Sequence, residues 1–159
     1  MSVTGEMIQV MTFPDGFVPA YLARPEGNGP WPGVLVIQEA FGLNAHIKNV
    51  ARRVAAEGYV ALAPDLFYRG GAGRTAGYDD LPKALQLMGA LKDDQIVADV
   101  GHAISQLERT PGVRRDRIGI TGFCMGGRVS YLVACALPDK IAAAVPFYEI
   151  GRASCRERV

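Results

Sequence analysis

The sequence lacks the features that mark several large classes of protein. Its 159 residues contain three cysteines, an odd number whose spacings match no zinc pattern, so we expect neither a disulfide framework nor a zinc site. The 17 basic residues nearly balance the 16 acidic ones and do not cluster, which disfavours a nucleic-acid partner or an anionic membrane surface. No apolar stretch is long enough to span a bilayer, and no signal peptide is visible. These absences predict a cytoplasmic protein.

Apolar residues make up 49% of the chain and charged residues 21%, as in an ordinary globular domain with its own core. Short apolar runs alternate with segments that have apolar residues at helical spacing. Strands are predicted over 8–11, 18–23, 33–37, 59–63, 117–121 and 141–145, and helices over 44–58, 81–91, 94–109 and from about 126 onward. The first two strands should pair antiparallel. The alternation that follows predicts an α/β fold, a mostly parallel sheet with helices on both faces.

The most informative stretch is Gly-Phe-Cys-Met-Gly-Gly, residues 122–127, between an apolar strand and a helical pattern. A nucleophile framed by glycines at a strand-to-helix turn is typical of a nucleophile elbow. The helix N-terminus favours a thiolate at Cys124, and the N–H of Met125 points to where an oxyanion would form. A buried cysteine in a tight turn is the alternative. A phosphate-binding loop is disfavoured because the lysine and hydroxyl residues of a P-loop are absent.

Glu39 is the second candidate for chemistry. It follows the buried strand 33–37, at the edge of the sheet where α/β proteins gather their ligand sites. The N–H of Ala40 could supply the second oxyanion donor. A solvated loop carboxylate is the alternative interpretation of Glu39. With Cys124 and Met125, this loop would give a nucleophile, a carboxylate and two backbone donors.

Three motifs in order along the chain resemble the dienelactone hydrolase family, the carboxymethylenebutenolidases. They are Gln-Glu-Ala-Phe-Gly-Leu-Asn at 38–44, Ala-Pro-Asp-Leu-Phe at 63–67 and the cysteine motif at 122–127. The resemblance extends from the first strands to Tyr148. It implies an α/β-hydrolase fold and hydrolysis of an enol-lactone or related ester through an acyl-cysteine, with no metal or organic cofactor.

The resemblance also implies roles for single residues. Cys124 would be the nucleophile, and Glu39 the carboxylate that helps to generate the thiolate when substrate arrives. Ala40 and Met125 would form the oxyanion hole. Phe41 and Tyr148 match positions that line the substrate pocket of the family.

The chain departs from the family pattern in its catalytic partners. The aspartate and histidine that complete the family's triad come after the last predicted strand, where this sequence has neither. The two histidines, His46 and His102, precede the elbow and are expected to lie on helices without a catalytic role. Asp65 matches a structural motif of the family and not the triad acid. We therefore expect the fold to lack its C-terminal strands and helix, and this fragment to be inactive as a complete enzyme.

The substrate itself stays open. Family members that act on carboxylated lactones use an arginine near the start of the helix predicted over 81–91, where this chain has Leu-Pro-Lys at 81–83. Lys83, Arg69 or Arg74 could bind an anion instead, although exposed charge is the simpler interpretation of each.

The last eleven residues, 149–159, show neither helical nor strand periodicity. They look like the in-frame translation of a common short-read sequencing adapter. The expectation is that residues 1–148 are the N-terminal part of one α/β-hydrolase domain and that 149–159 are not native. A genuine polar C-terminus is the alternative.

The sequence thus predicts a hydrolase for a small-molecule ester or lactone. Two alternatives keep the same fold. One is a thiol-redox or binding module in which Cys124 forms only mixed disulfides. The other is a non-catalytic relative that retains the elbow. The oligomeric state is not predicted.

Overall fold

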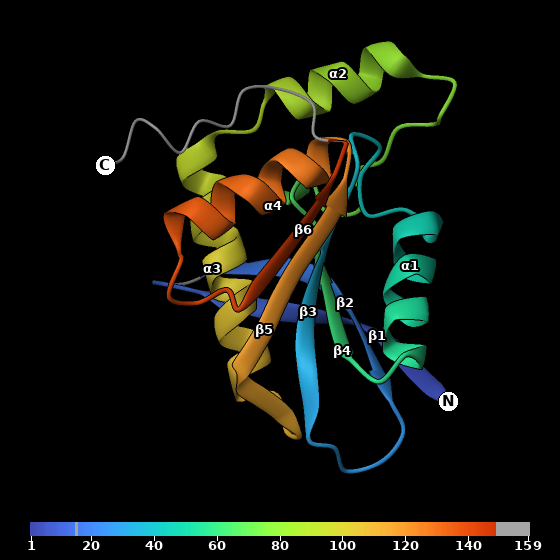
Figure 1. Ribbon diagram of the computed structural model, residues 1–159. Coiled ribbons are helices and arrows are strands. Elements are labelled where there is room, and N and C mark those ends of the chain that lie inside the picture. The colour runs from blue at the N-terminus through green and yellow to red at the C-terminus, as the bar shows by residue number, and fades with distance from the viewer. Residues whose placement is uncertain (15, 149–159) are drawn as a thin grey trace.

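The computed structural model describes residues 1–14 and 16–148, which form a six-stranded sheet with helices on both faces (Figure 1). The strands are β1 Val3–Thr12, β2 Gly16–Pro25, β3 Trp31–Ile37, β4 Val60–Pro64, β5 Val113–Phe123 and β6 Ala143–Phe147. The helices are α1 Ala45–Ala56, the short 3₁₀ helix η1 Tyr68–Gly70, α2 Leu81–Gly89, α3 Asp93–Arg109 and α4 Met125–Ala136. The predicted α/β class is confirmed. Segment 149–159 lies outside the described residues.

The strands lie in the order β1-β2-β4-β3-β5-β6. The β1–β2 hairpin is antiparallel, as predicted, and β2 also pairs antiparallel with β4. From β4 onward the neighbours β4–β3, β3–β5 and β5–β6 are all parallel. The observed strands β1, β2 and β5 are longer than the sequence predicts, because pairing with a neighbouring strand extends them past the apolar runs.

The two central strands β3 and β4 are apolar throughout because helices cover both of their faces. Every residue of β4 is buried. On one face, Leu35 and Ile37 of β3 pack with α3 and α4 in the larger core. On the other face, Val36 packs against Ile47 and Ala51 of α1. Asn44 caps α1 by accepting a hydrogen bond from the N–H of Ile47 at 3.1 Å, as its position before the helix predicts.

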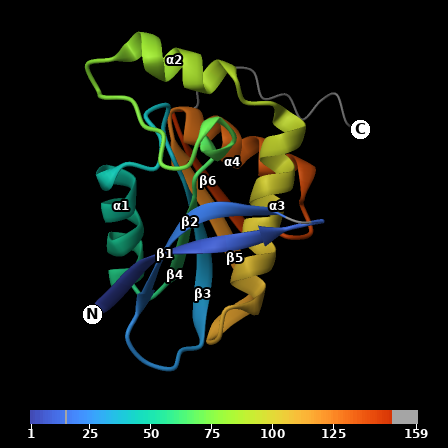
Figure 2. The same cartoon turned by 180° about the vertical axis from the view of Figure 1, so that it is seen from behind.

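The chain leaves β3 and β5, which are neighbours, toward opposite faces of the sheet. After β3 it forms α1 on one face, and after β5 it forms α4 on the other, beside α3 (Figures 1 and 2). Such a divergence opens a crevice at the carboxyl ends of the two strands, where open α/β sheets bind their ligands. The residues 38–44 and 122–127 lie at these two ends.

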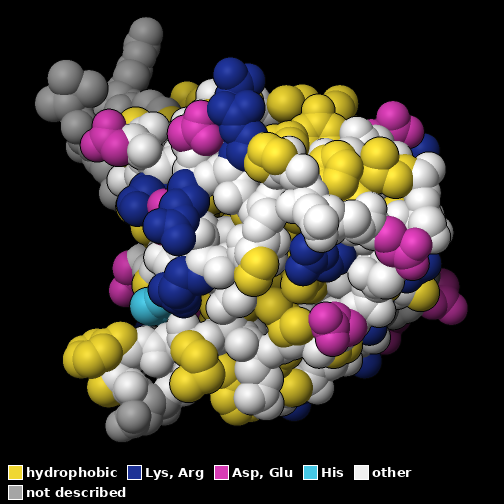
Figure 3. Space-filling model, turned by 90° about the horizontal axis from the view of Figure 1, so that it is seen from below, with side chains coloured by type: hydrophobic (Ala, Val, Ile, Leu, Met, Phe, Trp, Pro, Cys, Tyr) yellow, Lys and Arg dark blue, Asp and Glu magenta, His cyan; other side chains and the backbone are white. Residues whose placement is uncertain are grey.

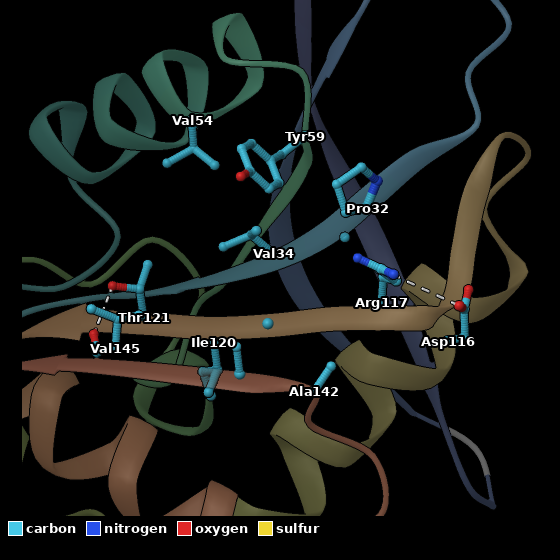
Figure 4. A pocket seen from close by; sticks show the side chains of 13 residues that line it. Pro32, Val34, Val54, Tyr59, Asp116, Arg117, Ile120, Thr121, Ala142 and Val145 are labelled. Atoms are coloured by element: carbon cyan, nitrogen blue, oxygen red, sulfur yellow. Dashed lines mark hydrogen bonds and ion pairs between the residues drawn. The ribbon is translucent and has the colours of Figure 1, made fainter.

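One part of the sheet is left open on the face that carries α1. Edge strand β6 is exposed along its whole length, and Val145 is 50% exposed. A hollow of about 690 Å³ lies beside it, and Val34, Val54, Tyr59 and Val145 line its apolar part (Figure 4). None of the residues predicted for chemistry lines this hollow. Charges of both signs are interspersed with hydrophobic side chains on the face shown in Figure 3.

The cysteines of the described region differ from one another. Cys124 has a free thiol, whereas Cys135 on α4 is disulfide-bonded.

An ion pair between the exposed Arg69 and the buried Asp99 anchors the loop after β4 to α3. Asp99 of α3 is 2% exposed and pairs with the Arg69 guanidinium, one of whose N–H groups donates to Oδ1 at 2.8 Å. The Tyr68 hydroxyl donates to the same oxygen at 3.1 Å. Arg69 is thus occupied in the structure, which argues against the role in anion binding considered for it from the sequence.

Replacing Arg69 by alanine should lower the free energy of unfolding by about 1–3 kcal/mol, because it leaves the buried Asp99 carboxylate with Tyr68 as its remaining side-chain donor. Urea unfolding followed by circular dichroism measures the change. Arg114→Ala is the matched control: it breaks the exposed pair with Asp116 and should leave stability nearly unchanged. Equal effects of the two substitutions would contradict an anchoring role for the Asp99 pair.

Candidate active site

Cys124 lies at the turn between β5 and α4 in a conformation that a residue with a side chain rarely adopts, with φ 58° and ψ −120°. Its N–H donates to the carbonyl of Phe147 at 3.1 Å, and its own carbonyl accepts from Gly127 and Arg128 at 3.0 and 3.2 Å. Strand β6 on one side and the first turn of α4 on the other therefore hold the turn in place. The thiol is partly exposed. This geometry is that of a nucleophile elbow.

Gly126 brings the elbow against the end of β3. A Cβ at this position would lie 2.6 Å from the carbonyl oxygen of Ile37 and 2.7 Å from that of Gln38. Real Cβ atoms do not approach backbone oxygens so closely, so the first turn of α4 can pack here only with glycine. This contact places Cys124 next to the loop that carries Glu39.

The loop after β3 begins with a tight turn from Glu39 to Gly42. The N–H of Gly42 donates to the carbonyl of Glu39 at 3.2 Å, and Gly42 has φ +91°. The N–H of Ala76 donates to the carbonyl of Phe41 at 3.1 Å and ties this turn to the loop after η1. Ala40 is buried within the turn, whereas Glu39 is partly exposed. The turn is thus held at several points, with its carboxylate at the surface.

Ala40 and Met125 belong to one apolar cluster, against which Cys124 packs. The turns and caps of the described residues use the N–H of neither Ala40 nor Met125. These two backbone N–H groups are the predicted oxyanion donors beside Cys124. Such a pair can stabilise the negative oxygen that forms when a thiolate attacks a carbonyl carbon.

Aromatic rings surround the site. Phe41 packs against Tyr78 with ring centroids 4.6 Å apart, and Phe123 stacks on Phe147 at 4.8 Å. Phe123 also meets Tyr148, at 6.1 Å. Of these five residues, the sequence predicts only Phe41 and Tyr148 for substrate binding. Tyr78 lies in a loop that matches no motif, so the sequence does not predict a place for it near the site. In the structure its hydroxyl accepts a hydrogen bond from Asn44 Nδ2 at 3.2 Å.

The electrostatics of Tyr148 show that the predicted site residues lie near one another. The pKa of its phenol is raised by partial desolvation first, although most of the side chain is exposed, and then by the charges of Glu39 and Cys124. Tyr148 thus lies within electrostatic reach of Glu39 and Cys124, while the chemical roles of the three residues stay predictions.

A groove of about 480 Å³ extends from this group along α1. Its walls include Glu39, Phe123 and Tyr148 from the site and His46 and Arg53 from α1. His46 is exposed on the helix surface, as the sequence predicts, and His102 is half-buried on α3. The groove is the described cavity that reaches the predicted site, in contrast to the larger hollow of Figure 4.

The other residues considered for chemistry lie elsewhere. Asp65 is buried and accepts hydrogen bonds from the N–H groups of Phe67 and Gly73 at 3.0 and 2.9 Å. Burial raises the pKa of its carboxyl, and the two N–H groups lower it less. This arrangement fits the structural role expected for Asp65. Arg69 and Arg74 line a separate small cavity of about 140 Å³, whose walls do not include Cys124 or Glu39.

Two features are absent from the described part of the chain. No group of three or more histidine, cysteine, aspartate or glutamate side chains there is placed to hold a metal ion. None of the helices in that part is both long enough and apolar enough to cross a membrane.

Comparison with known proteins identifies the family. The model of the "Dienelactone hydrolase family" matches residues 18–157. The chain belongs to the dienelactone hydrolase family. It is 43% identical over 133 residues to the "Putative carboxymethylenebutenolidase" of Escherichia coli K12, covering 82% of this chain and 48% of that protein. It is 38% identical over 134 residues to "Protein usf" of Aquifex pyrophilus, covering 82% and 56%.

Solved structures agree with this assignment to the dienelactone hydrolases. The Klebsiella pneumoniae "Putative Dienelactone Hydrolase" superimposes with a TM-score of 0.85 at 37% identity, over 97% of this chain and 64% of that one. The "Dienelactone Hydrolase-like Promiscuous Phosphotriesterase P91" from metagenomic libraries has a TM-score of 0.76 at 25% identity, over 97% and 63%. The α/β-hydrolase GrgF from Penicillium, at 19% identity and a TM-score of 0.65, agrees in fold. The chain thus spans about half the length of the curated relatives it matches.

The contact at Gly126 can be tested directly. Gly126→Ala should destabilise the protein by about 1–3 kcal/mol, because the added methyl group meets two backbone oxygens and overpacking of this kind is costly. The higher helix propensity of alanine offsets at most about 1 kcal/mol. Thermal unfolding of Gly89→Ala provides the control, since Gly89 ends α2 with open space around it. If both variants unfolded at the temperature of the parent, the close approach of α4 to β3 would be refuted.

Proposed function

We propose that the protein is the nucleophile-bearing part of a hydrolase that cleaves a small carboxylic ester or lactone through a cysteine acyl-enzyme. The observation that carries the proposal is the partly exposed thiol of Cys124 at a strained elbow, packed against the turn of Glu39 and Ala40. Membership of the dienelactone hydrolase family supports the class of reaction.

The first half of the proposed reaction uses the described residues. Glu39 takes the thiol proton when substrate arrives, and the thiolate sulfur of Cys124 attacks the carbonyl carbon. The electrons of the carbonyl π bond move to oxygen, and the N–H groups of Ala40 and Met125 bind the oxyanion. Its collapse reforms the carbonyl, breaks the ester C–O bond and leaves a thioester on sulfur. The departing alkoxide takes up the proton that Glu39 received from the thiol, which restores the carboxylate.

The second half transfers the acyl group to water. The family pattern assigns activation of this water to a histidine held by an aspartate, both later in the chain than Tyr148. Neither His46 nor His102 has the chain order of that triad, so we expect acylation without efficient turnover from the described residues alone. Removal of triad members elsewhere lowers turnover by several orders of magnitude.

The proposed substrate is small, uncharged near the reacting carbonyl and apolar or aromatic beside it. Phe41 and Tyr148 would contact it, and the rings of Tyr78 and Phe123 extend the same surface. Lys83 is an exposed residue in the first turn of α2, and no described contact joins it to the site. In the groove beside Glu39 and Tyr148, the Lys or Arg side chain on the wall is that of Arg53 on α1.

A thiol-redox or binding module is the second candidate function, favoured by the free, accessible Cys124 thiol at a helix N-terminus. It differs from the hydrolase in one respect that can be measured. A binding thiol reacts with alkylating reagents and disulfides, whereas the hydrolase thiol also accepts an acyl group from an ester.

Incubation with p-nitrophenyl acetate should release about one equivalent of p-nitrophenol in a burst and add one acetyl group at Cys124. Intact-protein and peptide mass spectrometry locate the group, and absorbance follows the burst. Cys124→Ala should abolish both signals, while circular dichroism should show that the fold is retained. Alkylation of Cys124 by iodoacetamide without acetylation by the ester would favour the thiol-binding function and overturn the hydrolase.

We also propose that residues 1–148 are the N-terminal part of one α/β-hydrolase domain and that 149–159 are foreign to it. One continuous sheet formed by the strands from Val3 to Phe147 supports the first statement. The second concerns residues outside the described part, and the family match itself extends to residue 157. Resequencing the source gene past codon 148 tests it. We expect the reading to continue with a different sequence that encodes an aspartate and a histidine, and a reproducible match to 149–159 would refute it.

A further inference from the structure

Gln38 connects β3 to the turn that carries Glu39 and Ala40, and its side chain is completely buried. Its Oε1 accepts a hydrogen bond from the N–H of Leu66 at 3.1 Å, in the loop after β4. Its backbone carbonyl lies against Gly126 at the start of α4. One residue therefore touches three segments: the turn with the proposed oxyanion donor, the loop after β4 and the elbow helix.

The amide nitrogen of the Gln38 side chain lacks a hydrogen-bond acceptor among the described residues. This nitrogen, Nε2, is buried. A buried amide donor without a partner costs about 1–3 kcal/mol. The bond to Leu66 therefore comes with an opposing cost on the same side chain, and the net contribution of the carboxamide to stability is small.

This near-balance distinguishes Gln38 from an ordinary structural residue. Methionine has a similar length and no polar hydrogens. Gln38→Met would remove the orphan Nε2 but leave the N–H of Leu66 as a new orphan, and the two effects are of about equal size. The substitution should leave stability nearly unchanged while it releases the start of the turn from the loop after β4.

We propose that Gln38 is a positioning residue that fixes the direction of the Ala40 N–H by tying the start of the turn to Leu66. The inference rests on the proposed function, since it concerns the oxyanion donor of that site. Ala40 lies two residues after Gln38, within the turn from Glu39 to Gly42. The far side of this turn is held by the N–H of Ala76, which donates to the carbonyl of Phe41. The bond to Leu66 is the side-chain contact that holds its near side.

Two reactions of the same thiol separate positioning from stability. Acetylation by p-nitrophenyl acetate passes through an oxyanion and needs the N–H of Ala40 in place, whereas alkylation by iodoacetamide is a displacement at carbon that forms no oxyanion. Both rates scale with the thiolate fraction of Cys124. The ratio of the two rates is therefore independent of the thiolate fraction. It reports how well the N–H donors stabilise the oxyanion.

We expect Gln38→Met to lower the ratio of acetylation to alkylation rates by about tenfold or more, below the roughly 100-fold or larger effect of losing an oxyanion donor outright. Gln38→Glu should restore much of the ratio, because a carboxyl oxygen can accept the Leu66 N–H. If Gln38→Met does not fold, Gln38→Asn takes its place. Its side chain is one methylene too short to reach Leu66, so we expect the same fall in the ratio. Gln86→Met changes an exposed glutamine on α2 and should behave as the parent.

Each outcome is decisive. A parent that is acetylated, with an unchanged ratio in folded Gln38→Met or Gln38→Asn, overturns the positioning role and leaves the proposed function standing. A parent that is alkylated but not acetylated overturns both. A reduced ratio that Gln38→Glu restores supports the inference, and unfolding temperatures within a few degrees of the parent show that stability is not its cause.

Discussion

The structure of the site depends on the close contact between the first turn of α4 and the end of β3. With glycine at 126, helix backbone lies directly on the carbonyl oxygens of Ile37 and Gln38. The two loops that leave these neighbouring strands toward opposite faces are thereby forced together at one edge of the sheet. Without that contact, Cys124 would sit at the end of one strand and Glu39 at the end of another, with no shared chemistry.

Much of the fold can be predicted from the sequence because its signals are local. The apolar run of β4 reflects burial on both faces, and the cap of Asn44 depends on a residue three positions away. Strand lengths could not be predicted, since pairing of residues far apart in sequence determines them. Ala143–Phe147 has the apolar composition of a buried strand, but it is the exposed edge of the sheet, because burial depends on neighbouring elements as well as on local composition.

The residues of the candidate site also differ in whether the sequence alone can locate them. Cys124, Glu39 and Ala40 can be located from motifs, because an elbow and a turn after a strand are short contiguous patterns. Tyr78 and the buried amide of Gln38 cannot, because their importance arises from contacts with Phe41 and Leu66 that only the folded chain creates. Sequence motifs thus identify the groups that react, while the groups that orient them become visible only through tertiary contacts.

These contacts also explain why the two halves of the proposed reaction are separable. In the proposed reaction, backbone interactions among residues 37–128 and one bond to Phe147 hold the nucleophile, and the bond between Gln38 and Leu66 helps to hold the predicted oxyanion donor of Ala40, so no side-chain base is needed to shape that half. Activation of water for the second half requires a side chain that can gain and lose a proton, and such a group can be supplied from any segment that reaches the open groove beside Glu39 and Tyr148. In the proposed mechanism, backbone donors set the geometry of acylation, and a movable side chain sets the rate of deacylation. The described chain therefore contains the component of the mechanism that must be rigid.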